Sequence, residues 1–136
     1  MKLKALGFAG LAVALSAISA SAHHSFAMFD TTATTTLDGT VKEFQWTNPH
    51  SWLFLAVADA DGQPVQWAIE LGGPGGLARQ GFAPTTLTPG MNVKVAIHPL
   101  KDGTHGGQFM GLTFADGTQL GNQNGRGGAR RGGDTP

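Results

Sequence analysis

The sequence predicts an all-β domain with small α content, an OB-like five-stranded antiparallel barrel with one short helix between strands 3 and 4. Five runs of strand length follow one another between residues 40 and 115, and Asp-Gly and Pro-Gly pairs separate several of them. A short helical segment lies between the third run and the fourth, which is the element order of an OB barrel. A small β-sandwich of the same strands is the alternative, because periodicity does not give strand order in space.

Two runs predict the first two strands. Residues 40–46 (TVKEFQW) are rich in β-forming residues, but Val41, Phe44 and Trp46 break strict alternation. This pattern predicts a bulge or a strong bend. Residues 52–58 (WLFLAVA) are almost continuously apolar, as in a strand that is covered on both faces or that curls within a small barrel.

The third strand has the clearest pattern, since residues 65–71 (VQWAIEL) alternate after the turn signal Asp61-Gly62. We expect this strand to point Trp67 inward. Leu77 to Gln80, between a glycine-rich stretch and Gly81, suits a helix of one or two turns.

The last two strands are predicted at residues 93–97, after the Pro89-Gly90 turn, and at residues 109–115. A glycine-rich connection at residues 102–107 joins them. The core predicted from all five strands consists of Val41, Phe44, Trp52, Phe54, Leu55, Val57, Trp67, Ile69, Val93, Val95, Ile97, Leu112 and Phe114.

The first 22 residues resemble a signal peptide. Two lysines precede the apolar run at residues 5–18, and Ala20-Ser21-Ala22 offers the small residues that a signal peptidase requires. The run is short for a membrane span, although an uncleaved anchor is the alternative. We expect a mature chain that begins at His23, is periplasmic or secreted, and has no membrane span.

Composition excludes several classes of function. The chain has no cysteine, so it forms no disulfide and no thiolate metal site. The domain at residues 23–120 carries four Lys or Arg and eight Asp or Glu side chains, a net charge of −4. Nucleic acid is therefore not an expected partner, because phosphate binding needs a basic groove.

The tail at residues 121–136 is rich in Gly and Arg and has no aliphatic or aromatic residue other than Ala129. It is predicted to be disordered, because it cannot bury enough apolar surface to offset the entropy lost on ordering. RNA binding by such an Arg-Gly segment is the alternative.

Two motifs carry a resemblance to a known family. Residues 23–26 read HHSF, and residues 48–52 read NPHSW. With these motifs the chain resembles a family of exported, uncharacterised bacterial proteins, which implies a small exported domain of no named activity. Asn-Pro-His and Gly39 to Val41 are also similar to exported bacterial OB-fold proteins of stress response. Further similarity to the first family lies at residues 67–71, 89–90 and 98–100.

Histidines near the mature N-terminus suggest a metal site. Cleavage after Ala22 gives His23 a free amine beside its imidazole, and His24 adds a second imidazole. If the N-terminal segment packs across the mouth of the barrel, His50 joins them, and this nitrogen-rich set favours Cu(II). Cleavage after Ala20 instead leaves Ser21-Ala22-His23, in which a histidine third from the amine also chelates copper or nickel.

Other side chains are weaker candidates. Met28 or Asp30 would serve as a supplementary ligand. His98 and His105 are poorer ligand candidates, because His98 lies at the end of a predicted strand and His105 lies in a glycine-rich loop. Glu70 lies where a strand meets a turn, and nothing in the sequence brings it to a second carboxylate at the spacing needed for acid–base catalysis. No catalytic residue is predicted, and the protein is not expected to be an enzyme.

The alternative function is a metal-free binding module. In this reading the barrel presents a face around Trp46, Trp52 and Phe54 to a partner protein or a small ligand. Exposed aromatic side chains would favour it.

Overall fold

The structure is a computed structural model that describes residues 26–121. The predicted signal peptide at residues 1–22, the predicted ligands His23 and His24, and the predicted tail beyond Gly121 lie outside these residues. The described elements are η1 (Phe26–Met28), β1 (Thr35–Gln45), β2 (Trp52–Ala58), β3 (Pro64–Glu70), α1 (Pro74–Arg79), β4 (Asn92–Pro99), β5 (Gly106–Phe114) and β6 (Gln119–Gly121).

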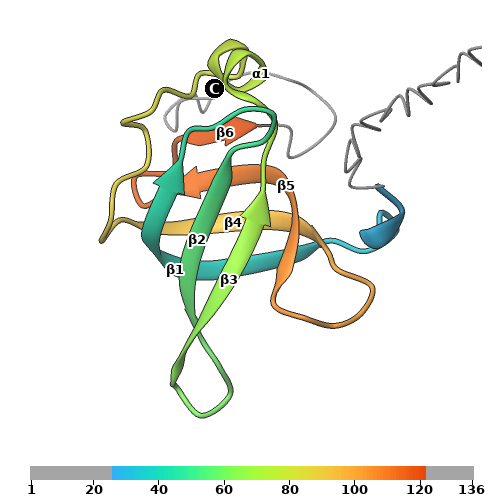
Figure 1. Cartoon of the computed structure of the whole chain (residues 1–136). Helices are drawn as coiled ribbons and strands as arrows, with labels where there is room; N and C mark the ends of the chain where they lie inside the picture. The colour runs from blue at the N-terminus through green and yellow to red at the C-terminus, as the bar shows by residue number, and fades with distance from the viewer. Residues whose placement is uncertain (1–25, 122–136) are drawn as a thin grey trace, which may run out of the picture.

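Five of these strands form a closed barrel (Figure 1). The neighbours run in the order β3-β2-β1-β4-β5-β6, and β3 also pairs with β5. This arrangement confirms the predicted barrel with one short helix between β3 and β4. The closing pair β3–β5 is parallel whereas the other pairs are antiparallel, so the barrel is mixed. A further strand, β6, was not predicted and pairs with β5. It ends at Gly121, which was predicted to belong to the tail.

The predicted irregularity in the first strand is a bulge. The register of β1 against β2 shifts between Val41 and Glu43, which leaves Lys42 as the extra residue. A bulge bends a strand and increases its twist. The first part of β1 therefore pairs with β4 and the second part with β2.

Apolar side chains from all five barrel strands fill the interior, but Trp52 and Phe54 do not. Both were predicted in the core, and both are instead half-buried on the outer face of β2, while Leu53 and Leu55 are fully buried. The other predicted core residues are buried or packed against the core. The buried cluster consists of Leu37, Val41, Leu53, Leu55, Ile69, Leu71, Leu77, Phe82, Leu87, Val93, Val95, Ile97, Leu112 and Leu120.

The turn between β2 and β3 decides which face of β2 is inside. Asp59 and Gln63 close a loop of residues 60–62, with Gly62 at a φ of 78°. This is the longer hairpin loop in which a left-handed glycine follows a turn. With a loop of this length, Leu53 of β2 pairs with Ile69 of β3. A one-residue change of register would move every β2 side chain to the opposite face.

One end of the barrel is covered by α1 and the segment after it (Figure 1). Leu77 of α1 is 1% exposed, and Phe82 and Leu87 of the following loop are buried with it in the core. The helix therefore contributes apolar burial at this end, as predicted. None of the helices in the described part of the chain is long and apolar enough to cross a membrane.

The register of β2 can be tested with two neighbouring substitutions. We expect Leu53→Ala to lower the free energy of unfolding by about 2–5 kcal/mol, because it empties a fully buried site. Phe54→Ala removes a larger side chain from the outer face, and we expect it to cost less. Urea denaturation of both variants measures the difference. A larger loss for Phe54→Ala would contradict the register.

Candidate functional site

The loop before β2 holds His50 in place. The Thr47 hydroxyl donates a hydrogen bond to the His50 carbonyl over 2.7 Å. The next residue, Ser51, is fully buried, and its amide donates to the Gly72 carbonyl over 3.1 Å. A Cβ at Gly73 would lie 2.8 Å from the Pro49 carbonyl oxygen, so glycine allows this loop to approach the end of β3. The backbone around His50 is thus fixed against the neighbouring strand.

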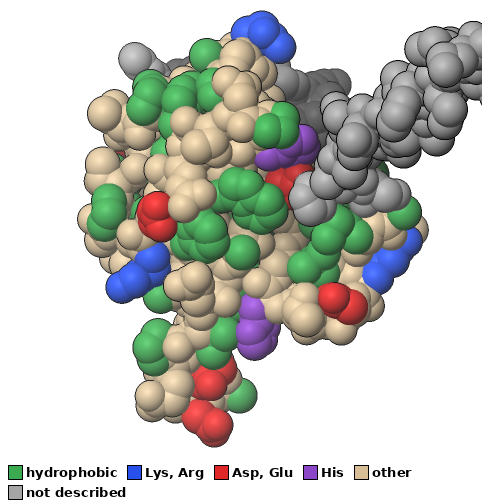
Figure 2. All heavy atoms as spheres, in the orientation of Figure 1, with side chains coloured by type: hydrophobic (Ala, Val, Ile, Leu, Met, Phe, Trp, Pro, Cys, Tyr) green, Lys and Arg blue, Asp and Glu red, His purple; other side chains and the backbone are tan. Residues whose placement is uncertain are grey.

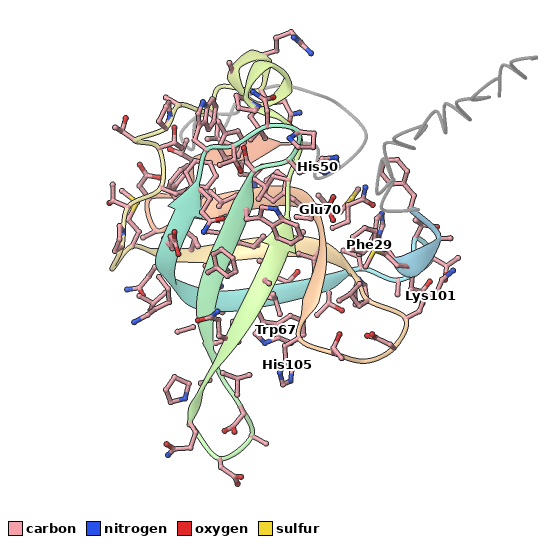
Figure 3. All side chains as sticks on the ribbon, viewed as in Figure 1. Phe29, His50, Trp67, Glu70, Lys101 and His105 are labelled. Carbon is pink, nitrogen blue, oxygen red and sulfur yellow. The ribbon has the colours of Figure 1, made fainter. Side chains whose placement is uncertain are left out.

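His50 forms an ion pair with Glu70. The Nδ1 atom of His50 contacts Oε1 of Glu70. Glu70 lies opposite Trp52 in the β2–β3 register, and His50 precedes Trp52 by two positions. His50 and Glu70 are therefore diagonal neighbours on the outer face, within reach of long side chains. Figure 3 shows the two side chains next to each other at this edge of the barrel.

The two members of the pair differ in exposure. Glu70 is 7% exposed, whereas the His50 side chain is 39% exposed. A buried carboxylate needs partners that compensate for the loss of water, and His50 Nδ1 is one such partner. Because Nδ1 contacts Glu70, Nε2 is the ring nitrogen left for another ligand. A carboxylate that fixes the second nitrogen of a histidine is also what metal-binding histidines commonly have.

A small hollow lies beside this pair. Its volume is about 120 Å³, and Phe26, the first described residue, belongs to its lining. The Phe26 side chain is itself 67% exposed. The other lining residues are His50, Glu70, Leu71, Gly72, Gln108 and Phe109. The described chain therefore begins at the edge of the hollow that contains His50 and Glu70.

The segment after Phe26 is attached to the barrel by its backbone. The Lys101 amide donates to the Met28 carbonyl over 3.0 Å, and the Asp30 amide donates to the Pro99 carbonyl over 2.8 Å. Between these bonds, Phe29 is 5% exposed and forms a bridge with Leu100. These contacts hold residues 28–30 against Pro99 to Lys101, and Phe26 is the described residue of this segment that shares a hollow with His50.

The weaker ligand candidates Met28 and Asp30 have contacts of their own. Asp30 Oδ1 accepts hydrogen bonds from the amide and the hydroxyl of Thr32. These bonds lower the pKa of Asp30, because they favour the charged carboxylate. Met28 lines a second, larger hollow together with Glu70.

The other two histidines have different surroundings. His98 Nδ1 lies 2.7 Å from the Ala33 carbonyl oxygen, so this ring is tied to the N-terminal segment. The His105 ring packs against Trp67 with centroids 5.0 Å apart, away from His50 (Figure 3). Among residues 26–121, no group of three or more His, Cys, Asp or Glu side chains gathers as a metal site would require. The prediction that His23 and His24 join His50 as ligands therefore stays a prediction.

Glu70 is the member of the site that the sequence did not identify. Glu70 ends an alternating strand, but the face that it occupies is known only when the register of that strand with β2 is known. Once Trp52 is opposite Glu70, the diagonal contact with His50 follows. The useful signal was that Glu70 is the one charged residue of this strand, next to the strand that begins after Asn-Pro-His.

Fold and site together define a small closed β-barrel that carries a carboxylate-held histidine on its outer surface. The model of a family described as "Family of unknown function (DUF6152)" matches residues 11–109, and the chain belongs to this family. Comparisons with curated proteins and with solved structures give no match. The family carries no stated activity, so the function has to be argued from the site.

The ion pair can be tested by a double-mutant cycle. We expect His50→Ala to destabilise the protein by about 1–3 kcal/mol, because it leaves the buried carboxylate of Glu70 without this partner. Glu70→Gln in the same protein should recover part of the loss, since a neutral amide is cheaper to bury than a carboxylate. Urea denaturation of the single and double variants gives the coupling free energy. Additive effects of the two substitutions would mean that the pair is not coupled.

Proposed function

We propose that the mature protein is exported to the periplasm or secreted, and that it binds one Cu(II) ion through His23, His24 and His50. The observation that carries this proposal is the pairing of His50 with the buried carboxylate of Glu70. This pairing supports a ligand role because it orients the imidazole and leaves Nε2 for a metal ion.

The position of Phe26 supports the participation of the N-terminal histidines. Phe26 lines the same hollow as His50, and His23 precedes it by three residues. Three extended residues span at most about 11 Å. The amine and imidazole of His23, with the imidazole of His24, are therefore within chain reach of the hollow.

The donor set determines the choice of metal. An amine nitrogen and imidazole nitrogens suit Cu(II) better than other divalent first-row ions, and copper accepts the tetragonal arrangement that such ligands provide. No thiolate is available to favour Zn(II). Met28 and Asp30 become less suitable as supplementary ligands, because Met28 lines the other hollow and the Asp30 carboxylate is bonded to Thr32.

Binding rather than catalysis is the proposed role, and nucleic acid is not a proposed partner. On the face shown in Figure 2, the described Lys and Arg side chains are scattered and lie apart from one another. Such scattered charges do not form the continuous basic groove that a phosphate backbone requires.

The proposal can be tested by calorimetric titration with a competing chelator. We expect the mature protein that begins at His23 to bind one Cu(II) ion, more tightly than Zn(II) and less tightly as the pH falls, because amine and imidazole bind metals only when deprotonated. We expect His50→Ala to weaken binding at neutral pH. Glu70→Gln should weaken it by about 10- to 100-fold, because it removes the group that orients His50.

Two further proteins complete this experiment. One extra glycine before His23 moves the amine away from the imidazole and should weaken binding, whereas His105→Ala is the matched control and should bind as the parent does. Equal affinity of the extended and mature proteins would show that the amine is not a ligand. Failure of every protein to bind copper would favour the metal-free binding module instead.

A further inference from the structure

A second and larger hollow lies on the other side of Glu70. Its volume is about 250 Å³, and Glu70 belongs to the lining of both hollows. Trp52 and Ala68 contribute from the outer faces of β2 and β3. The remaining lining residues are Met28, Phe29, Leu100, Thr104, His105, Gly106 and Gly107.

Hydrogen bonds fix the walls of this hollow in place. The N-terminal wall at Met28 is bonded to Lys101, and the Leu100 amide donates to the Gly106 carbonyl over 3.1 Å. The loop wall is braced by Asp102, whose carboxylate accepts from the amide and the hydroxyl of Thr104. These bonds lower the pKa of Asp102, because they favour the charged carboxylate. The hollow is therefore formed before any ligand enters it, as is usual for small-molecule sites.

The chemistry of the hollow is asymmetric. Most of its wall is apolar, from side chains such as Met28, Phe29, Trp52 and Leu100, and Glu70 is the one acidic residue in its described lining. Within residues 26–121, Glu70 is the one charged side chain that is buried. A carboxylate offers about four lone-pair sites, and the contact with His50 occupies one side of the group. Neither Lys nor Arg is among the described residues that line the hollow.

We propose that this hollow binds a small organic cation, an ammonium group carried on a single ring or a short apolar chain. The ammonium group donates to the carboxylate of Glu70, and the apolar part packs against Trp52, Met28 and Phe29. A charge-assisted hydrogen bond to a buried carboxylate is stronger than a neutral one, and an aromatic face adds attraction for the cation.

The volume sets the size of the ligand. A cavity of about 150 Å³ lined by apolar side chains binds benzene, and drug-sized ligands occupy pockets of about 300–1,000 Å³. The hollow at about 250 Å³ lies between these sizes. One ring with a short ammonium arm fits this range.

This inference does not depend on copper binding. The metal proposal uses His50, which Glu70 orients, and the chain before Phe26. The cation proposal uses Glu70 itself as the acceptor, together with the walls of the larger hollow. His50→Gln therefore separates the two proposals. It removes the proposed metal ligand and keeps the proposed acceptor of the ammonium group.

The experiment uses the full mature chain, freed of metal with a chelator, and three probes of similar shape. Isothermal titration and tryptophan fluorescence are measured with 2-phenylethylamine, 2-phenylethanol and 3-phenylpropionate at neutral pH. We expect the ammonium compound to bind about tenfold or more tightly than the alcohol, the ratio that a hydrogen bond to a charged group supplies. The carboxylate compound should not bind.

Substitutions localise the site. Glu70→Gln should remove the preference for the ammonium compound, and Ala68→Leu should abolish binding of the amine and the alcohol by filling the hollow. His50→Gln should keep the affinity for the ammonium compound while it loses copper binding. Because Glu70→Gln removes the partner of His50, circular dichroism must show that each variant is folded, and Ala68→Leu provides an independent test that leaves the ion pair intact.

Three results would overturn the proposal. Equal affinity for the amine and the alcohol would show that the carboxylate does not recognise the ligand. Absence of binding by the mature protein at millimolar concentrations would show that the hollow is not a cation site. Binding seen only in a protein without residues 23–25 would show that the N-terminus of the chain itself fills the hollow.

Discussion

The parallel pairing of β3 with β5 is the contact on which the rest of the structure depends. It joins Ala68 to Gly106 and Glu70 to Gln108, and it closes the sheet into a barrel. Glycine favours this close approach, since a Cβ at Gly106 would lie 3.1 Å from the Ala68 carbonyl oxygen on β3. The same pairing positions both hollows, because their floors are made of the ends of the two paired strands. The candidate sites therefore depend on the same strand pairing that closes the barrel.

Glu70 is buried although its position in β3 lies on the outer face of the barrel. The residue faces away from the core, yet His50 and the N-terminal segment lie around it. A leucine at this position would satisfy burial at less cost, because a carboxylate must recover the hydration that it loses. The presence of a carboxylate there is consistent with a role in orienting His50, in binding a ligand, or in both. The two proposals share this residue and differ in everything else that they require.

Element types and their order could be predicted from the sequence, because alternation, turn pairs and the short helical segment are local signals. The bulge after Val41 could also be predicted, because a break in the alternation of apolar residues is a local signal. Burial of Trp52 and Phe54 was predicted wrongly, because it depends on the hairpin register. Asp61-Gly62 is equally compatible with a two-residue turn, which would pair Phe54 with Ile69, and with the longer loop that is observed. The ion pair of Glu70 with His50 depends on that register, and the buried Phe82 and Leu87 belong to a loop with no periodicity.

The bent strand β1 has a consequence for how the barrel loses its structure. Its pairings with β4 and with β2 overlap only at Gly39 and Thr40, and a Cβ at Gly39 would lie 2.8 Å from the Ala56 carbonyl oxygen. The two halves of the barrel, β2 with β3 and β4 with β5, both pair with β1, so neither half can open at this crossing without releasing a strand that the other half also uses. The pairing of β3 with β5 joins the two halves again on the far side. We therefore expect the domain to open as one cooperative unit, with slow amide exchange over β1 to β5 together instead of separate regions of different stability.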